Sequence, residues 1–174
     1  MPSSHPPLTG IERPFGDDEI IVSKTDANGK ITYVNDVFVR VSAYPRSELI
    51  GAAHSIIRHP EMPRCVFQLL WDTIQDGREM FAYVVNRAAN GDHYWVFAHV
   101  TPTFDAAGRI GGYHSNRRTV DRRVLPSVKA LYARLLAAEQ GHARKRDAIA
   151  ASTSLLNRHL KEKGQSYDAF VWSL

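Results

Sequence analysis

Two short runs of the chain carry the side chains best suited to hold a ligand. The run Arg58-His59-Pro60-Glu61 places a permanent cation, an imidazole and a carboxylate close together, and its prolines restrict the backbone that carries them. Residues 90–96 join an Asn-Gly turn to an aromatic strand, because Asn and Gly tolerate the positive φ of tight turns. The two runs predict a stiff polar loop facing a sheet, an arrangement typical of a ligand pocket.

Length and composition limit the kind of protein that can contain this pocket. The chain has 174 residues, of which 44% are hydrophobic, enough for one domain with an appendage. A single cysteine excludes an internal disulfide framework and a cysteine zinc cluster, and is consistent with a reducing cytoplasm. The sequence contains no run long and apolar enough to span a bilayer, so we expect no contact with a membrane.

The net charge of +4 permits a nucleic-acid partner, but the cations are scattered. They are denser only around Arg117-Arg118, Arg122-Arg123 and residues 144–146. We interpret these groups as solvated helix faces and expect no binding of nucleic acid.

The pattern of turns and apolar residues predicts an α+β fold. Alternation and turn residues predict strands near 20–25, 30–34, 80–87, 93–103 and 109–119. Short helices come after the first two strands, the first of them capped by Asn35 or Asp36, and a longer helix spans 63–76. Because neighbouring hairpins pair antiparallel, the prediction is a five-stranded antiparallel sheet with helices over one face.

Three segments follow from the changes of pattern along the chain. Residues 1–17, rich in Pro, Gly and Ser, read as an extended arm, and residues 18–120 as the domain that carries the pocket. Residues 121–174 carry two apolar stripes of helical period and an apolar end, which predict amphipathic C-terminal helices that dock on the domain, a second copy or a partner.

The motifs resemble those of PAS domains, and most of all the flavin-binding PAS domain of bacterial aerotaxis receptors. The likeness covers about residues 15–135 through Tyr33 to Phe38, Gly51 to Pro63, Trp71, Val85 to Arg87 and Asn90 to Val96. It implies the PAS fold and a non-covalent FAD between sheet and helices, whose redox change is passed to a signalling partner. The family pattern has Asp where this chain has Glu61. The cofactor site implied by the resemblance consists of Asn35, His54, Arg58, His59, Glu61, Trp71, Asn86 and Trp95.

Each of these side chains also has a simpler interpretation. Arg58 can pair with the pyrophosphate of FAD or with a nearby carboxylate, and His59 can donate to the cofactor or cap its own loop. Trp71 can stack on a flavin or pack in the core. Asn86 offers a donor and an acceptor to the uracil-like edge of a flavin, or caps a turn.

Other chemistries find less support in the sequence. In light-sensing PAS relatives, a cysteine forms a covalent adduct with flavin at the position where this chain has His54, so photoadduct chemistry is not expected. We interpret Cys65 as a small buried hydrophobic residue. No spacing of histidines predicts a metal site, and no nucleophile elbow or phosphate loop predicts an enzyme. The alternative to an FAD sensor is a PAS interaction module without flavin or with another ligand such as haem. We expect a homodimer, with a chemotaxis receptor or kinase as a possible signalling partner.

Overall fold

A computed structural model describes residues 5–174. Its centre is a five-stranded sheet of order β2-β1-β5-β4-β3 in which every neighbouring pair is antiparallel. The strands are β1 (Ile21–Asp26), β2 (Ile31–Val34), β3 (Met80–Arg87), β4 (His93–Phe104) and β5 (Ile110–Arg118). The predicted antiparallel sheet of the PAS fold is therefore confirmed, with strand bounds within two residues of those expected.

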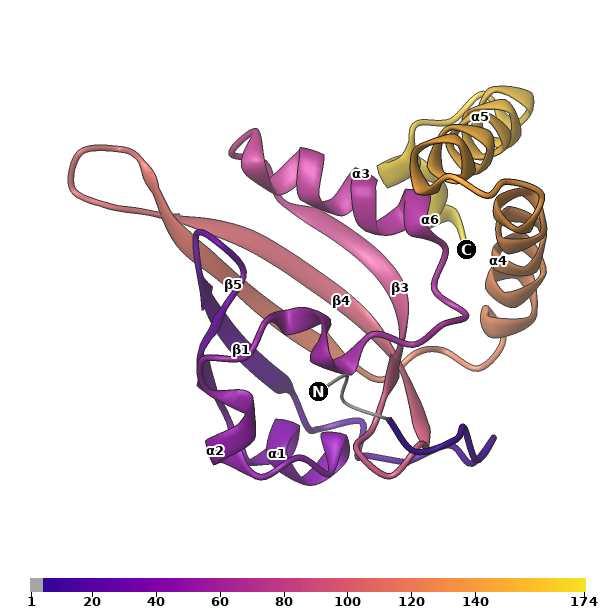
Figure 1. Cartoon of the computed structure of the whole chain (residues 1–174). Coiled ribbons are helices and arrows are strands. Elements are labelled where there is room, and N and C mark those ends of the chain that lie inside the picture. The colour runs from indigo at the N-terminus through magenta and orange to yellow at the C-terminus, as the bar shows by residue number, and fades with distance from the viewer. Residues whose placement is uncertain (1–4) are drawn as a thin grey trace.

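Four short or medium helices lie between β2 and β3 and cover one face of the sheet (Figure 1). They are α1 (Asp36–Ser42), α2 (Arg46–Leu49), the 3-10 turn η1 (His54–Ile57) and α3 (Arg64–Gln75). Asn35 caps α1 as predicted, because its side-chain oxygen accepts a hydrogen bond from the backbone N–H of Phe38. The longer helix that the sequence predicted over 63–76 is α3.

The period of two along each strand decides which side chains face the helices. On β3 and β4 the alternate residues Val84, Asn86 and Ala98 face inward, while their neighbours Phe81 and Phe97 face outward. Several inward residues are small or polar, including Ala98 and Asn86, and they line a space between the sheet and the helices. The sheet thus forms the floor of a hollow.

The C-terminal segment forms α4 (Leu125–Gln140), α5 (Lys145–Lys163) and α6 (Tyr167–Ser173), which wrap around the β3 edge of the sheet (Figure 1). The hydroxyl of Tyr132 on α4 donates to the backbone oxygen of Tyr83 on β3, 2.5 Å away. Trp172 of α6 lies edge-on to the outward rings of Phe81 and Phe97. Helix α5 packs beside α3 on the helical face of the sheet, so these helices dock on the chain's own domain.

The described part of the N-terminal arm, residues 5–17, runs beside the turn between β3 and β4. The backbone N–H of Arg13 donates to the oxygen of His93 at 2.7 Å, and the hydroxyl of Thr9 donates to the carboxylate of Asp92 at 2.5 Å. The boundaries proposed at residues 17 and 120 stay predictions. Between residues 5 and 174 the helices are too short or too polar to cross a bilayer.

Candidate functional site

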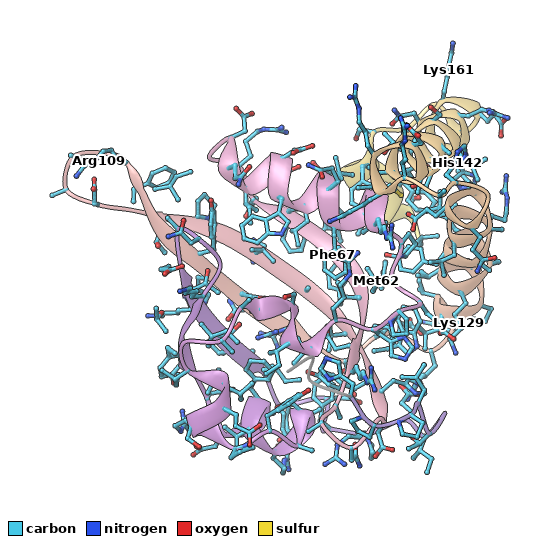
Figure 2. All side chains as sticks on the ribbon, in the orientation of Figure 1. Met62, Phe67, Arg109, Lys129, His142 and Lys161 are labelled. Carbon is cyan, nitrogen blue, oxygen red and sulfur yellow. The ribbon has the colours of Figure 1, made fainter. Side chains whose placement is uncertain are left out.

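A cavity of about 380 Å³ lies between the inner face of the sheet and α3. This volume falls within the range of small-molecule sites, and apolar side chains dominate its walls. Figure 2 shows Phe67 directed from α3 toward the space over the sheet. Strands β1, β3, β4 and β5, the η1 turn, α3 and α5 contribute its lining, which includes Ser23, His54, Arg58, Arg64, Phe67, Leu70, Trp71, Asn86, Tyr113, Arg117, Lys145 and Ile149.

A buried guanidinium lies at the floor of this cavity. Arg117 of β5 is 2% exposed, and its Nη2 donates to Ser23 Oγ at 2.6 Å while its Nη1 donates to His54 Nε2 at 3.3 Å. Its guanidinium carbon lies 4.5 Å from the centroid of the Phe38 ring, and its Nε has no hydrogen-bond partner among the described residues. None of these groups is a carboxylate, so the cation is buried without an opposite charge.

Electrostatics keep this cluster cationic and His54 neutral. Burial lowers the pKa of Arg117 to about 10, which leaves it charged at neutral pH. Burial and then the positive charge of Arg117 lower the pKa of His54 from 6.5 to about 3. A neutral imidazole can accept the hydrogen bond from Arg117, which an imidazolium cannot do.

An aromatic pair forms another part of the wall. Trp71 on α3 lies edge-on to Tyr113 on β5, with 5.6 Å between the ring centroids. The indole also reaches the β1–β2 turn, where a Cβ placed on Gly29 would come within 2.8 Å of the Trp71 ring. Gly29 has φ of +79°, so both its backbone conformation and its close approach to the indole favour glycine.

Asn86 and Arg58 meet where the polar loop joins the sheet. Their backbones form an antiparallel bridge, which ties the loop to β3. Asn86 is 4% exposed and its side chain lines the cavity. The Arg58 guanidinium lies over the Phe67 ring at 4.4 Å, and burial, followed by the charge of Arg64, lowers its pKa. Together with the exposed Arg64 and Lys145, Arg58 makes the rim of the cavity basic.

The structure brings His54, Arg58, Trp71 and Asn86 together around one cavity, and places the other four predicted residues elsewhere. Asn35 uses its side-chain oxygen for the N–H groups of Val22 and Phe38, and its amide nitrogen for the backbone oxygen of Ile20. These bonds hold β1 against α1. For this amide the structure shows a structural role outside the cavity lining.

The remaining three side chains point away from the cavity or support its loop. His59 is buried, and its Nδ1 accepts a hydrogen bond from the backbone N–H of Glu61 at 3.1 Å. His59 therefore caps its own loop, which was the simpler of its two interpretations. The Glu61 side chain is exposed. Trp95 lies on the outer face of the sheet opposite Val85, with Lys129 of α4 over its ring. A ligand in the cavity would have to cross the sheet to reach Trp95.

Sequence reasoning missed the buried cation of the cavity, Arg117. We interpreted Arg117 and Arg118 as a solvated helix face, and this is wrong, because both lie in β5. The alternation of the strand turns Arg117 inward and Arg118 outward, where it is exposed. Counting the period of two from the inward-facing Tyr113 would have placed Arg117 on the cavity side.

Cys65 and the histidines do not change this description. Cys65 is buried, does not line the cavity, and has its thiol pKa raised chiefly by burial. Across residues 5–174 no three His, Cys, Asp or Glu side chains converge in a way that could hold a metal ion. The cavity can hold a largely apolar small molecule, with Asn86 able to donate to and accept from a polar group and Arg117 able to pair with a negative charge.

Comparisons with known proteins identify the domain around this cavity. Residues 31–116 match the family described as the PAS fold. Over 130 residues the chain is 42% identical to the aerotaxis receptor of Escherichia coli K12, covering 75% of this chain and 26% of the receptor. This part of the chain is a PAS domain of the aerotaxis-receptor type, as its motifs predicted. The chain spans about a quarter of that receptor's length.

Solved structures show the same fold. The dark structure of the blue-light photoreceptor Aureochrome1 LOV superimposes with a TM-score of 0.54 at 24% identity, over 70% of this chain and 84% of that one. A light-oxygen-voltage domain studied with a flavin analogue gives a TM-score of 0.56 at 16% identity, over 66% of this chain and 86% of that one. These two structures share the fold of this domain, whereas the more similar relative is named as an aerotaxis receptor.

Proposed function

We propose that this PAS domain binds FAD non-covalently in the cavity and acts as a redox sensor. The observation that carries the proposal is Arg117, a cation buried at the cavity floor without a carboxylate partner. An uncompensated buried charge destabilises the empty protein, so it favours a ligand that brings negative charge to this place. A flavin is flat and largely apolar, has a polar edge, and supplies reversible electron transfer when bound.

The residues present fit such a ligand. Trp71 and Tyr113 offer aromatic surface to a ring system, and Asn86 offers a donor and an acceptor to its polar edge. Arg117 would stabilise negative charge that a flavin ring gains on reduction, and would thereby raise the reduction potential. Arg58, Arg64 and Lys145 suit the phosphates of a dinucleotide, which favours FAD over FMN.

The output of the sensor is a protein contact rather than a reaction. The relatives with the same domain are named as an aerotaxis receptor and a nitrogen fixation regulatory protein, both of which are regulatory. We infer a cytoplasmic homodimer that passes the redox state to a partner such as a chemotaxis receptor or kinase. Light scattering of the oxidised and dithionite-reduced protein tests this step, and a monomer in both states would contradict the dimer.

The absorption spectrum of the purified protein tests the ligand. We expect flavin bands that dithionite bleaches and air restores, and chromatography after acid release should recover FAD. Recovery of FMN alone would keep a flavin sensor but remove the dinucleotide. Haem bands, or a protein that neither retains nor takes up flavin, would overturn the proposal in favour of a PAS module with another ligand or none.

A further inference from the structure

Helix α3, which walls the cavity, begins without a cap of its own. Pro63 occupies its N-cap position and supplies no side-chain hydrogen bond to the first turn. The first N–H groups of a helix have no partner inside the helix and need one from elsewhere. Here Glu139 from the end of α4 supplies it, since its Oε1 accepts from the backbone N–H of Arg64 at 2.7 Å and of Cys65 at 3.3 Å.

The same oxygen also joins α5 to this contact. The hydroxyl of Ser152 on α5 donates to Glu139 Oε1 at 2.9 Å. Glu139 is 8% exposed and Ser152 is fully buried, so water does not compete strongly for these bonds. Negative charge is favourable at the N-terminus of a helix, which adds to the hydrogen bonds. One carboxylate therefore connects α3, α4 and α5.

Two of the connected helices, α3 and α5, enclose the cavity from two sides. Phe67 and Trp71 line it from α3, whereas Lys145 and Ile149 line it from the first turns of α5. Arg58 links the cavity to the contact: burial and Arg64 lower its pKa, and the nearby Glu139 carboxylate opposes that shift. The C-terminal helices thus touch both the ligand space and the helix that shapes it.

We propose that α5 is a wall of the ligand site, fastened to α3 through Glu139 of α4, so that ligand binding and docking of α4 and α5 are coupled. In this arrangement Glu139 is a positioning residue, acting through the first turn of α3. Because coupling is reciprocal, the factor by which docking strengthens ligand binding equals the factor by which the ligand strengthens docking. The inference rests on the proposed function insofar as its ligand is FAD, and it assigns the C-terminal helices a part in holding that ligand.

The test compares two identical substitutions, Glu139→Gln and Glu162→Gln. Glu162 is an exposed carboxylate on α5, so its variant controls for the loss of one charge. Loss of charge-assisted hydrogen bonds should weaken FAD binding to Glu139→Gln about tenfold, with Glu162→Gln unchanged. In the wild type, FAD should slow hydrogen exchange in residues 125–163 as well as in the strands of the cavity.

Hydrogen exchange in Glu139→Ala tests whether Glu139 couples the helices to the ligand. If it does, FAD should still protect the strands of this variant but should no longer protect residues 125–163. Equal FAD affinity in Glu139→Gln and Glu162→Gln, or no protection of residues 125–163 in the wild type, would overturn the inference. If the wild type binds no FAD, the proposed function fails. Hydrogen exchange in the ligand-free protein then tests whether Glu139 fastens the helices: Glu139→Ala should accelerate exchange in both α3 and α5. Unchanged exchange in α3 would overturn the inference.

Discussion

Arg117 and Glu139 are both buried charges next to the same cavity, yet their surroundings differ. The Glu139 oxygen accepts three hydrogen bonds from groups of α3 and α5, two of them from a helix N-terminus that favours its charge. Arg117 has a neutral imidazole, a hydroxyl and an aromatic ring around it, and its Nε stays unpartnered within the described structure. One charge has its hydrogen-bond partners within the fold, and the other has no opposite charge among the described residues around it.

This difference has opposite consequences for the stability of the ligand-free protein. A charge whose partners all come from the protein contributes to the folded state whether or not a ligand is present. A buried cation without an anion costs stability in the empty protein and favours binding of an anionic group. The two sites therefore make opposite predictions for variants that remove the charge.

The largest effect should come from Arg117→Met, which removes the cation and keeps a long side chain. We expect FAD affinity to fall about 10- to 100-fold, because a hydrogen bond to a charged group contributes about 1.5–3 kcal/mol. The free energy of unfolding of the ligand-free protein should rise by about 1–3 kcal/mol. The two-electron reduction potential of the bound flavin should fall by about 30 mV for each tenfold by which the reduced form loses more affinity than the oxidised form.

Arg118→Met is the matched control, since Arg118 is the exposed neighbour on the outer face of the sheet. Isothermal titration of ligand-free protein, urea unfolding and a spectroscopic redox titration measure the three quantities. A less stable ligand-free Arg117→Met protein, or one with unchanged flavin affinity and potential, would show that Arg117 serves the fold rather than the ligand.

The free energy of unfolding should depend on pH, because His54 stays neutral beside Arg117 in the folded protein. The pKa of His54 is lowered from 6.5 to about 3 in the folded state, so unfolding takes up a proton below pH 6.5. The free energy of unfolding should fall with decreasing pH below 6.5, by up to about 1.4 kcal/mol per unit, until the folded-state pKa is reached. Urea unfolding of wild type and His54→Gln between pH 4 and 8 measures this difference. Parallel curves would mean that His54 titrates normally.

Trp71→Ala probes the aromatic wall, where no charge is involved. We expect FAD affinity to fall about tenfold, because an aromatic contact contributes about 0.5–1.5 kcal/mol beyond its buried area. The sheet should remain folded, as circular dichroism would show. The control is Trp172→Ala on the outer face, where the indole is 63% exposed. Equal flavin binding by both variants would assign Trp71 to the core alone.

The smallest effect should come from Glu61→Gln. The sequence placed Glu61 in the cofactor site, but its side chain is exposed and does not line the cavity. We expect less than about a twofold change in FAD affinity, as is usual for surface substitutions away from a site. The same chemical change at Glu139 should have a larger effect. A strong loss of binding in Glu61→Gln would show that the loop bearing it closes onto the ligand.

The sequence predicted the strands well because their signals are local. Turns near Gly29, Gly91 and Gly108 separate runs of alternating or apolar residues, and each of these glycines has positive φ in the structure. The long helix was equally predictable from its apolar period. The resemblance to PAS motifs correctly placed four residues around one cavity, namely His54, Arg58, Trp71 and Asn86. It also predicted Trp95, which lies on the opposite face of the sheet.

The sequence by itself determined the order of elements, the PAS fold and a polar loop beside a sheet, because turn chemistry and periodicity act over a few residues. Only the tertiary structure decided whether the charged side chains Arg117 and Glu139 are buried and which groups they contact. Whether Arg117 faces water or a cavity depends on strand pairing and on the helices above it, and Glu139 meets the N-terminus of α3 across 75 residues of chain. Such contacts depend on long-range packing, which no local pattern encodes.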